Sequence, residues 1–252
     1  MKRFFPALVA LTLLAVTTIS QATVTSGLIG WWIFNDPSSS VYAQDSSGHG
    51  HPGTLTSTAY FTPDSLRTQV LDVAGAPGEV DYGIPFSPFS GTISVWVKPT
   101  LAVTGDVIRQ DTTALPGTSG TYYVYDLRVS ATGKPSAIIG NPNFKAGQKD
   151  PQIVVTGKAS VKLNQWTHLT MRWDSSAGVL SLFINGKLAG SATYTPLTGL
   201  GLPYDGTSPM KVAAAIWDFN NGYLEYVGEL SDFRFYGRAL ADTEIYQIYN
   251  GQ

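Results

Sequence analysis

The chain of 252 residues contains no cysteine, only three histidines and few charges, since Asp, Glu, Lys and Arg together make up 13%. Without cysteine there is no disulfide framework, no thiol nucleophile and no cysteine-based zinc site. A domain of this length can bury enough apolar surface to fold without disulfides. Glutamate is also scarce, with four residues at positions 79, 225, 229 and 244. This scarcity limits the carboxylate pairs that are available for glycoside chemistry.

The N-terminus carries the pattern of a secretory signal. Two basic residues precede the apolar stretch Phe4–Ile19, and Ser20-Gln21-Ala22 fits the small-x-small rule for cleavage after Ala22. We therefore predict a signal peptide over residues 1–22 and a secreted, periplasmic or cell-surface location. No other segment is apolar enough to span a membrane. Cleavage removes two of the 16 basic residues and none of the 18 acidic ones, which leaves a net charge of −4. A mildly acidic chain argues against a nucleic-acid partner.

The composition favours many short strands joined by tight turns. Hydrophobic residues make up 43% of the chain, and 26 glycines and 15 prolines supply turn formers. No internal repeat or low-complexity linker interrupts the sequence, so residues 23–252 are expected to form one domain. All-β domains of this length are common as single units.

The segment Gln165–Gly190 reads as three successive antiparallel strands. Residues 167, 169, 171 and 173 are expected to share one face of the first strand, and residues 166, 168, 170 and 172 the polar opposite face. A turn cluster separates this strand from the apolar run Val179–Ile184. Asn185-Gly186 then supplies two residues that tolerate positive φ, as a type I′ hairpin requires. A half-buried sheet of this kind needs a second sheet to cover its apolar face.

Several segments carry a family resemblance. Trp166–Leu169 (WTHL) and Leu182–Leu188 (LFINGKL), Gly27–Phe34 (GLIGWWIF) with Asp45–Leu55, Gly91–Pro99 (GTISVWVKP), and Gly228–Leu240 occur in the order of the signature strands of one family. In these segments the chain resembles the laminin G-like domains of the concanavalin A-like lectin/glucanase superfamily. The resemblance spans nearly the whole mature chain and implies a two-sheet antiparallel jelly-roll sandwich, an all-β fold. Because this fold hosts lectins, adhesion domains, glycosidases and lyases, it does not by itself define a function.

Near the C-terminus the sequence predicts one long strand and one short helix. The strand is expected over Tyr223–Tyr236, as the last strand of the sandwich. Ile245, Ile248 and Tyr249 form a short apolar stripe at helical spacing, and Asn250-Gly251 can end the helix. We expect this helix to pack as a lid on the edge of the sandwich.

The resemblance also implies a structural calcium ion. In related domains the Asp-x-Ser-Gly loop, here Asp45–Gly48, lies near the closing strand, where an Asp that matches Asp232 joins it on the ion. Calcium prefers carboxylate and carbonyl oxygens, so Asp45 and Asp232 are the predicted charged ligands and Gly48 and His51 the predicted carbonyl donors. Ser231 replaces a second acid found in many relatives. The competing interpretation is that Asp45 caps a turn by accepting backbone N–H groups.

A catalytic site is not evident. The superfamily's glycosidases carry a Glu-x-Asp-x-(x)-Glu strand, and the nearest approach here is Glu225, Glu229 and Asp232. Four residues of extended chain separate the two glutamates by roughly 13 Å, which is too far for a direct acid and nucleophile pair. Phe144–Gly147 (FKAG) resembles a motif of alginate lyases of this fold, but it lies mid-chain and without the accompanying Gln-x-His strand. We therefore predict that the protein is not an enzyme.

Aromatic residues beside polar ones indicate a sugar-binding surface. Sugar rings stack on Trp and Tyr, while Asp, Asn and backbone amides bind the hydroxyls. Trp217 with Asp218 and Asn220 is the best candidate, and Tyr123 and Tyr125, expected on one strand face, are the second. The competing interpretation is that these aromatics pack in the core.

Taken together, the sequence predicts a secreted, non-catalytic, lectin-like domain that binds a glycan or polysaccharide and holds a structural calcium ion. An extracellular protein is the other candidate partner. A polysaccharide hydrolase or lyase of the same fold, or a protein-binding adhesion domain, is the alternative. A deep groove with clustered carboxylates would favour the enzyme, and a shallow aromatic-lined surface would favour the binding domain.

Overall fold

The computed structural model describes residues 24–73, 78–83, 86–112, 122–147, 152–198, 201–202, 206, 208–213, 216–218 and 222–251. For residues 57, 78, 216–218 and 222–224 it describes the backbone alone. The predicted signal peptide lies outside the described residues. Among the helices of the described residues, none has the length and apolar character that crossing a membrane requires.

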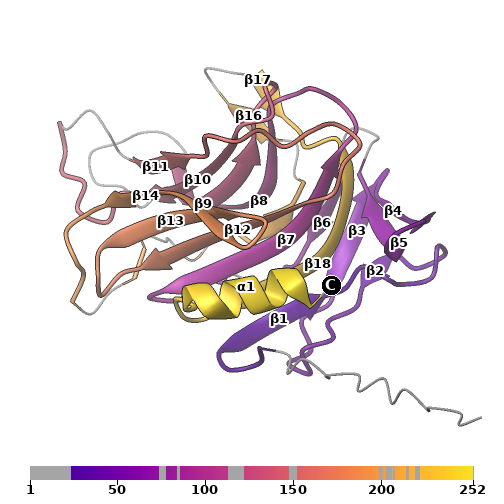
Figure 1. Cartoon of the computed structure of the whole chain (residues 1–252), viewed down its shortest axis with the longest axis horizontal. Helices are drawn as coiled ribbons and strands as arrows, with labels where there is room; N and C mark the ends of the chain where they lie inside the picture. Colours follow the sequence, from indigo (N-terminus) through magenta and orange to yellow (C-terminus); the bar gives the residue numbers. More distant parts are fainter. Residues whose placement is uncertain are drawn as a thin grey trace, which may run out of the picture.

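Two large antiparallel sheets pack face to face, as Figure 1 shows. Sheet A has the strand order β14 (Lys187–Thr193), β13 (Val179–Ile184), β12 (Thr167–Asp174), β7 (Gly91–Pro99), β18 (Gly228–Tyr236), β5 (Thr68–Asp72) and β4 (Tyr60–Asp64), and β1 (Leu28–Trp32) also pairs with β18. Sheet B has the order β11 (Gln152–Thr156), β10 (Pro135–Gly140), β9 (Tyr122–Val129), β8 (Gly105–Thr112), β15 (Lys211–Val212), β6 (Gly78–Asp81), β3 (Gly53–Ser57) and β2 (Tyr42–Ala43). A small hairpin joins β16 (Ile216–Asp218) to β17 (Gly222–Leu224). The predicted all-β jelly-roll sandwich is confirmed.

The predicted three-strand meander is present as β12, β13 and β14. Asn185 and Gly186, with φ of 50° and 71°, form the turn between β13 and β14. The alternation on β12 also holds, because Leu169, Met171 and Trp173 are fully buried in the core. Local sequence was sufficient here because a two-residue turn fixes the register of both strands.

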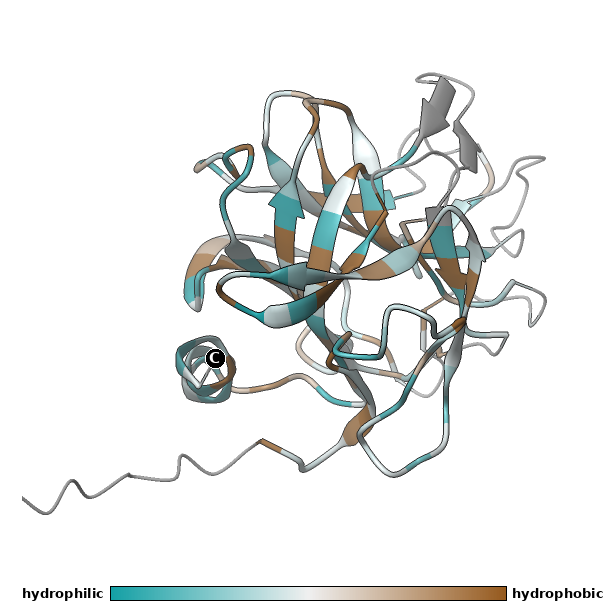
Figure 2. Cartoon of the chain, turned by 90° about the vertical axis from the view of Figure 1, so that its right-hand side faces the viewer, coloured by the Kyte–Doolittle hydropathy of each residue, from teal (hydrophilic) through white to brown (hydrophobic). Residues whose placement is uncertain are grey.

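The core between the sheets is rich in aromatic rings. Trp32 stacks on Phe233 with ring centroids 4.7 Å apart, and Trp173 stacks on Tyr125 at 5.5 Å. Trp32 and Phe233 lie on paired strands of sheet A, whereas Trp173 and Tyr125 come from different sheets and connect the two layers. Truncation of such a buried aromatic residue to alanine typically costs about 3–5 kcal/mol of stability. In Figure 2 the hydrophobic and hydrophilic colours alternate along the strands, as expected when one face of each sheet is buried.

The outer face of sheet A is partly covered by the C-terminal helix α1 (Asp242–Asn250). Ile245 and Ile248 are buried with Phe183 and Tyr236, which lie on the outer side of β13 and β18. Figures 1 and 2 show the helix lying against this side of the sandwich. The outward face of β12 is therefore not a solvated polar face over its whole length, because α1 covers His168, which is fully buried.

The predicted single strand Tyr223–Tyr236 is two separate strands. β17 ends at Leu224 and belongs to the small hairpin, whereas β18 starts at Gly228 and belongs to sheet A. Gly228 adopts a φ of 153°, a conformation that residues with a side chain rarely adopt, and a Cβ there would lie 2.4 Å from the Lys98 carbonyl oxygen. The new strand begins at a glycine, the residue type that permits this backbone conformation. Glu225 and Glu229 consequently do not share a strand face.

Candidate ligand-binding groove

The open half of the outer face of sheet A carries a groove beside the C-terminal end of α1. We call it the Arg67 groove. Its volume is about 470 Å³, and it is lined by Ile33, Leu66, Arg67, Thr68, Trp96, Trp166, Ser231 and Asp232. These residues come from the end of β1, the β4–β5 turn, β7, β18 and the start of β12. The groove therefore forms only when five separate segments of the chain are assembled.

Asp64 stabilises the β4–β5 turn, which places Arg67 in the groove. One carboxylate oxygen of Asp64 accepts hydrogen bonds from the backbone N–H groups of Leu66 and Arg67, both at 2.9 Å. The other oxygen accepts one from Lys98 Nζ at 3.1 Å. Burial alone would raise the pKa of Asp64, but these hydrogen bonds outweigh it and lower the pKa. The turn is thus pinned to the central strand β7 through a charged group.

The groove is built around a stack of aromatic rings and cations. The Arg67 guanidinium carbon lies 3.9 Å from the centroid of the Trp96 ring and 5.0 Å from that of Trp166. Lys98 Nζ lies 5.6 Å from the Trp166 centroid, and Tyr249 of α1 stacks on Trp96 at 5.6 Å. Cation–π contacts of this kind hold the guanidinium in a defined position. Trp166 is half-buried, so part of its ring faces the groove.

Two donor groups in this stack have unused hydrogen-bonding capacity. The Arg67 side chain forms neither a hydrogen bond nor an ion pair within the described part of the chain. The buried indole Nε1–H of Trp96 likewise has no acceptor. Burial lowers the pKa of Arg67 to about 10, although the charges of Asp232 and Asp64 oppose this shift. Arg67 is therefore still charged at neutral pH, and its own N–H groups are the donors that the groove offers, since the Trp96 Nε1–H is closed to solvent.

The backbone at the groove is left-handed at two positions. Thr68 and Asp232 adopt φ values of 65° and 49°, in the left-handed region. Thr68 is β-branched and is strained there, whereas Asp is among the residues that tolerate this conformation. Asp232 sits at an irregularity in the pairing of β18 with β7, between Ser231 and Arg234. Strained residues of this kind cluster at functional sites, which supports the choice of this groove.

Asp232 is the one predicted metal ligand that lines the groove. Its two oxygens accept hydrogen bonds from Arg234 Nε and Nη2 at 2.9 and 3.0 Å, and the Trp31 indole N–H donates a third. Arg234 and the Trp31 indole therefore occupy both oxygens of the Asp232 carboxylate. Asp232 forms an ion-paired and well-held part of the groove wall.

The second predicted metal ligand, Asp45, caps its own loop. Its oxygens accept backbone N–H groups from Trp31, Ser47 and His51 at 2.8 to 3.0 Å. Burial alone would raise the pKa of Asp45, but these bonds and one from the Ser47 side chain lower it. This is the arrangement of the competing, turn-capping interpretation.

The donor set does not fit a calcium ion. The His51 carbonyl, a predicted ligand, accepts a hydrogen bond from the Trp32 indole at 2.7 Å. Gly48, the other predicted carbonyl donor, has a φ of 88° and lies in open space. Asp45 and Asp232 are already occupied by N–H donors, and the described residues contain no group of three or more His, Cys, Asp or Glu side chains that could hold a metal. Calcium needs six to eight oxygen ligands, so we build no part of the function on it.

The two tyrosines predicted to bind ligand lie elsewhere, and on opposite sides of sheet B. Tyr125 is fully buried in the core against Trp173, which leaves it no surface for a ligand. A β-bulge on β9 opposite Gln110 and Asp111 places Val124 beside Tyr125 in the core and turns Tyr123 to the outer face. The expectation that Tyr123 and Tyr125 share a face is therefore wrong, because a bulge resets strand alternation.

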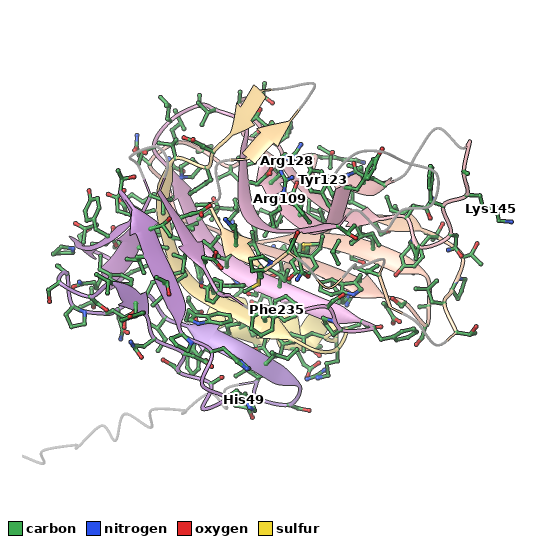
Figure 3. The ribbon with its side chains drawn as sticks, turned by 180° about the vertical axis from the view of Figure 1, so that it is seen from behind. His49, Arg109, Tyr123, Arg128, Lys145 and Phe235 are labelled. Carbon is green, nitrogen blue, oxygen red and sulfur yellow. The ribbon has the colours of Figure 1, made fainter. Side chains whose placement is uncertain are left out.

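Tyr123 belongs instead to a buried charged cluster on the outer face of sheet B. Figure 3 shows Arg109, Tyr123 and Arg128 converging below the β16–β17 hairpin. Asp106 accepts hydrogen bonds from Arg109 and Arg128 at 2.8 and 2.7 Å, and Arg128 donates to the Tyr123 hydroxyl at 2.6 Å. The side chains of Asp106, Arg109 and Tyr123 are at most 6% exposed. We interpret this cluster as structural because the side chains of Asp106, Arg109, Arg128 and Tyr123 bind one another.

The remaining candidates, Trp217, Asp218 and Asn220, cannot be assigned a role from the geometry. Trp217 and Asp218 lie on β16, for which only the backbone is described, with Trp217 paired to Tyr223 of β17. Asn220 lies outside the described residues. As ligand contacts these three stay predictions.

Comparison with known proteins defines the family. The model of the concanavalin A-like lectin/glucanases superfamily, laminin G type, matches residues 83–246. The chain therefore belongs to this superfamily. Human pentraxin-related protein PTX3 is 29% identical over 154 residues, which are 60% of this chain and 36% of PTX3. The chain thus spans about a third of the length of this relative.

Solved structures support the same fold. Domain 4 of AbnA, a GH43 extracellular arabinanase from Geobacillus stearothermophilus, in complex with arabinotriose, matches with a TM-score of 0.59 and 18% identity over 88% of this chain and 98% of that one. The botulinum neurotoxin serotype D ligand-binding domain in complex with N-acetylneuraminic acid matches with a TM-score of 0.60 and 14% identity, over 90% of this chain and 52% of that one. At these identities the likeness establishes the fold alone.

Sequence reasoning missed Arg67, Trp96 and Trp166 as site residues. A signal was present for the two tryptophans, because each alternates with core residues and so points to the outer side of sheet A: Trp96 lies between Val95 and Val97, and Trp166 precedes Thr167. An aromatic residue on the polar side of a strand is a candidate for ligand contact. Nothing in the local sequence marks Arg67, which reads as an ordinary turn residue.

Proposed function

We propose that this protein is a secreted, non-catalytic, lectin-like domain that binds a glycan in the Arg67 groove. The observation that carries the proposal is the combination, in one open groove, of the partly exposed Trp166 ring with the unused N–H donors of Arg67. Sugars are bound by this combination of an apolar ring face and a few oriented polar groups. The membership of the lectin/glucanase superfamily is consistent with it.

Binding without turnover agrees with the state of the nearby acids. Asp64 and Asp232, the carboxylates closest to the groove donors, are each held by a cation and by N–H groups. Glu229, on the adjacent outward position of β18, pairs with Lys98 at 2.8 Å. A general acid must hold a proton near neutral pH, whereas hydrogen bonds and Lys98 lower the pKa of Asp64. These groups are therefore suited to holding the groove in shape.

Further support comes from similar proteins and from the N-terminal sequence. Two structural neighbours were solved with an arabino-oligosaccharide and with a sialic acid, and one of them is part of an extracellular enzyme. The predicted signal peptide at residues 1–22 favours export. We transfer to this chain only the general property of binding sugar outside the cell.

The test is a glycan array followed by calorimetry on the best ligand. We expect saturable binding by the native chain, loss of at least tenfold in affinity for Trp166→Ala, and no release of reducing sugar during prolonged incubation. Tyr42→Ala is the matched control, because Tyr42 is an exposed aromatic residue at the β2 edge of sheet B. Sustained sugar release would refute the non-catalytic assignment. Equal losses in Trp166→Ala and Tyr42→Ala would show that the Arg67 groove is not the site.

A further inference from the structure

The Arg67 groove contains a cation that no acid of the described chain binds directly. The other cations around it are paired: Lys98 binds Asp64 and Glu229, and Arg234 binds Asp232. We infer that Arg67 forms a subsite for the carboxylate of an acidic sugar. This inference rests on the proposed glycan binding and names the class of glycan.

The stacked position of Arg67 leaves its hydrogen-bonding edge unused. A guanidinium carries five N–H donors in its plane, and its faces are the parts that stack on aromatic rings. The guanidinium carbon lies 3.9 Å from the Trp96 ring centroid and 5.0 Å from that of Trp166, within the range of cation–π contacts. The in-plane donors have no acceptor among the described side chains or carbonyls. A planar carboxylate matches such an edge with two parallel hydrogen bonds.

Trp96 holds Arg67 in place. Its side chain lines the same groove as Arg67, whereas its Nε1–H is closed to solvent and has no acceptor among the described residues. Trp96 is fixed from the opposite side by Tyr249 and His168, with centroids 5.6 and 5.1 Å away. The subsite is therefore rigid before ligand arrives.

The two acids whose charges act on Arg67 are already bound by other groups. Asp64 accepts from two backbone N–H groups and from Lys98, and Asp232 accepts from Arg234 and from the Trp31 indole. Their orientations are set by these partners, so Arg67 can reach a ligand oxygen without breaking an existing pair. An uncharged sugar would leave the guanidinium with weaker acceptors than an ionised one.

Matched ligands test the charge separately from the sugar ring. We would measure binding of trigalacturonate against its methyl ester, and of 3′-sialyllactose against lactose, by calorimetry at pH 7 in 50 mM and 300 mM salt. At least one acidic member of the two pairs is expected to bind more tightly than its neutral partner, on the order of tenfold, as for a hydrogen-bonded charged group. The preference should fall at the higher salt concentration.

Two variants assign the preference to Arg67. Arg67→Gln should abolish the preference for the acidic ligand, and Arg67→Lys should keep part of it because the charge remains without the planar two-donor edge of the guanidinium. Unfolding temperatures of each variant control for folding. If Arg67→Gln fails to fold, Arg67→Lys and the ligand pairs on the native chain still decide the outcome.

The outcomes separate this inference from the proposed function. Equal affinity for both members of each pair, with binding abolished in Trp166→Ala, would overturn the carboxylate subsite and leave glycan binding intact. A preference for acids that survives in Arg67→Gln would place the carboxylate elsewhere and also overturn it. Absence of binding to every glycan on the array would overturn the proposed function, and this inference with it.

Discussion

Replacement of Asp126 by asparagine should make the protein less sensitive to rising pH. Asp126 is fully buried in the charged cluster of sheet B, and neither carboxylate oxygen accepts a hydrogen bond from the described residues. Arg128 Nη2 lies 3.0 Å from one of them but donates to the Tyr123 hydroxyl, and Arg128 Nε donates to Asp106. Burial, followed by the charge of Asp106, raises the pKa of Asp126 well above its ordinary value.

A charge count explains why this group holds a proton. The cluster contains three carboxyl groups, on residues 106, 111 and 126, and two guanidinium groups, on residues 109 and 128. Fully ionised, it would carry a net negative charge in a buried site. Lys211, which also acts on Asp111, is already paired with Glu79 at 2.9 Å. One bound proton removes the excess charge of the cluster. We assign this proton to Asp126, because its carboxyl group has the poorest hydrogen bonding of the three.

The sign of the effect follows from proton binding in the two states. Between the ordinary aspartate range near pH 4 and the raised pKa, the folded state holds a proton that the unfolded state has released. The free energy of unfolding therefore falls as the pH rises, by about 1.4 kcal/mol per pH unit for one proton. Asp126→Asn removes this pH-dependent loss. The free energy of unfolding of the variant should therefore match or exceed that of the native chain at pH 8, and the two values should differ least at pH 4.

Urea denaturation at intervals from pH 4 to pH 8 measures the effect, since two pH units of full titration correspond to about 2.8 kcal/mol. Asp81→Asn is a suitable control, because Asp81 is a partly exposed carboxyl on the neighbouring strand β6. If Asp126→Asn were less stable than the native chain by the same amount at every pH, Asp126 would be an ionised partner of Arg128. The account of the cluster given above would then be refuted.

Three further predictions concern the groove and the loops around it. Asp64→Ala should cost about 1–3 kcal/mol of stability and weaken glycan binding, because the turn that carries Arg67 loses its acceptor; unchanged binding by calorimetry would contradict this. Addition of EDTA or of calcium should leave the unfolding temperature unchanged, since the oxygens of Asp45 and Asp232 already accept N–H donors; a rise of several degrees with calcium would restore the metal site. Burial, assisted by the charges of Arg234 and Arg67, lowers the pKa of His168 to about 3. NMR should therefore show no titration of its ring between pH 5 and 8. Stability should be lost as the pH falls from 6.5 towards 3, by a total on the order of 5 kcal/mol, and His168→Gln should lose less over the same range.

The hairpins and the inward faces of the strands could be predicted because their causes are local. Asn185-Gly186 permits a tight turn, and the alternation from Leu169 to Trp173 fixes which face is buried. Trp32 of β1 is likewise fully buried in the core. The family signature segments then set the order of strands along the chain.

Two errors came from backbone irregularities that pairing partners impose. The bulge opposite Gln110 and Asp111 separates Tyr123 from Tyr125, and the break before Gly228 divides the expected last strand. In each case the neighbouring strand decides where regular alternation stops. A periodicity of two along one strand carries no information about its partner.

The two-layer β fold, the superfamily and the meander follow from the sequence, because turn residues and alternating hydrophobicity act over a few neighbouring positions. The tertiary structure alone decided that Arg67, Trp96 and Trp166 meet in one groove, since 29 and 70 residues separate consecutive members of this set along the chain. It also decided which charges find partners. Lys98 and Arg234 have acids within 3 Å, whereas Arg67 stacks on rings without one, and burial and pairing of this kind exist only after the sheets have packed.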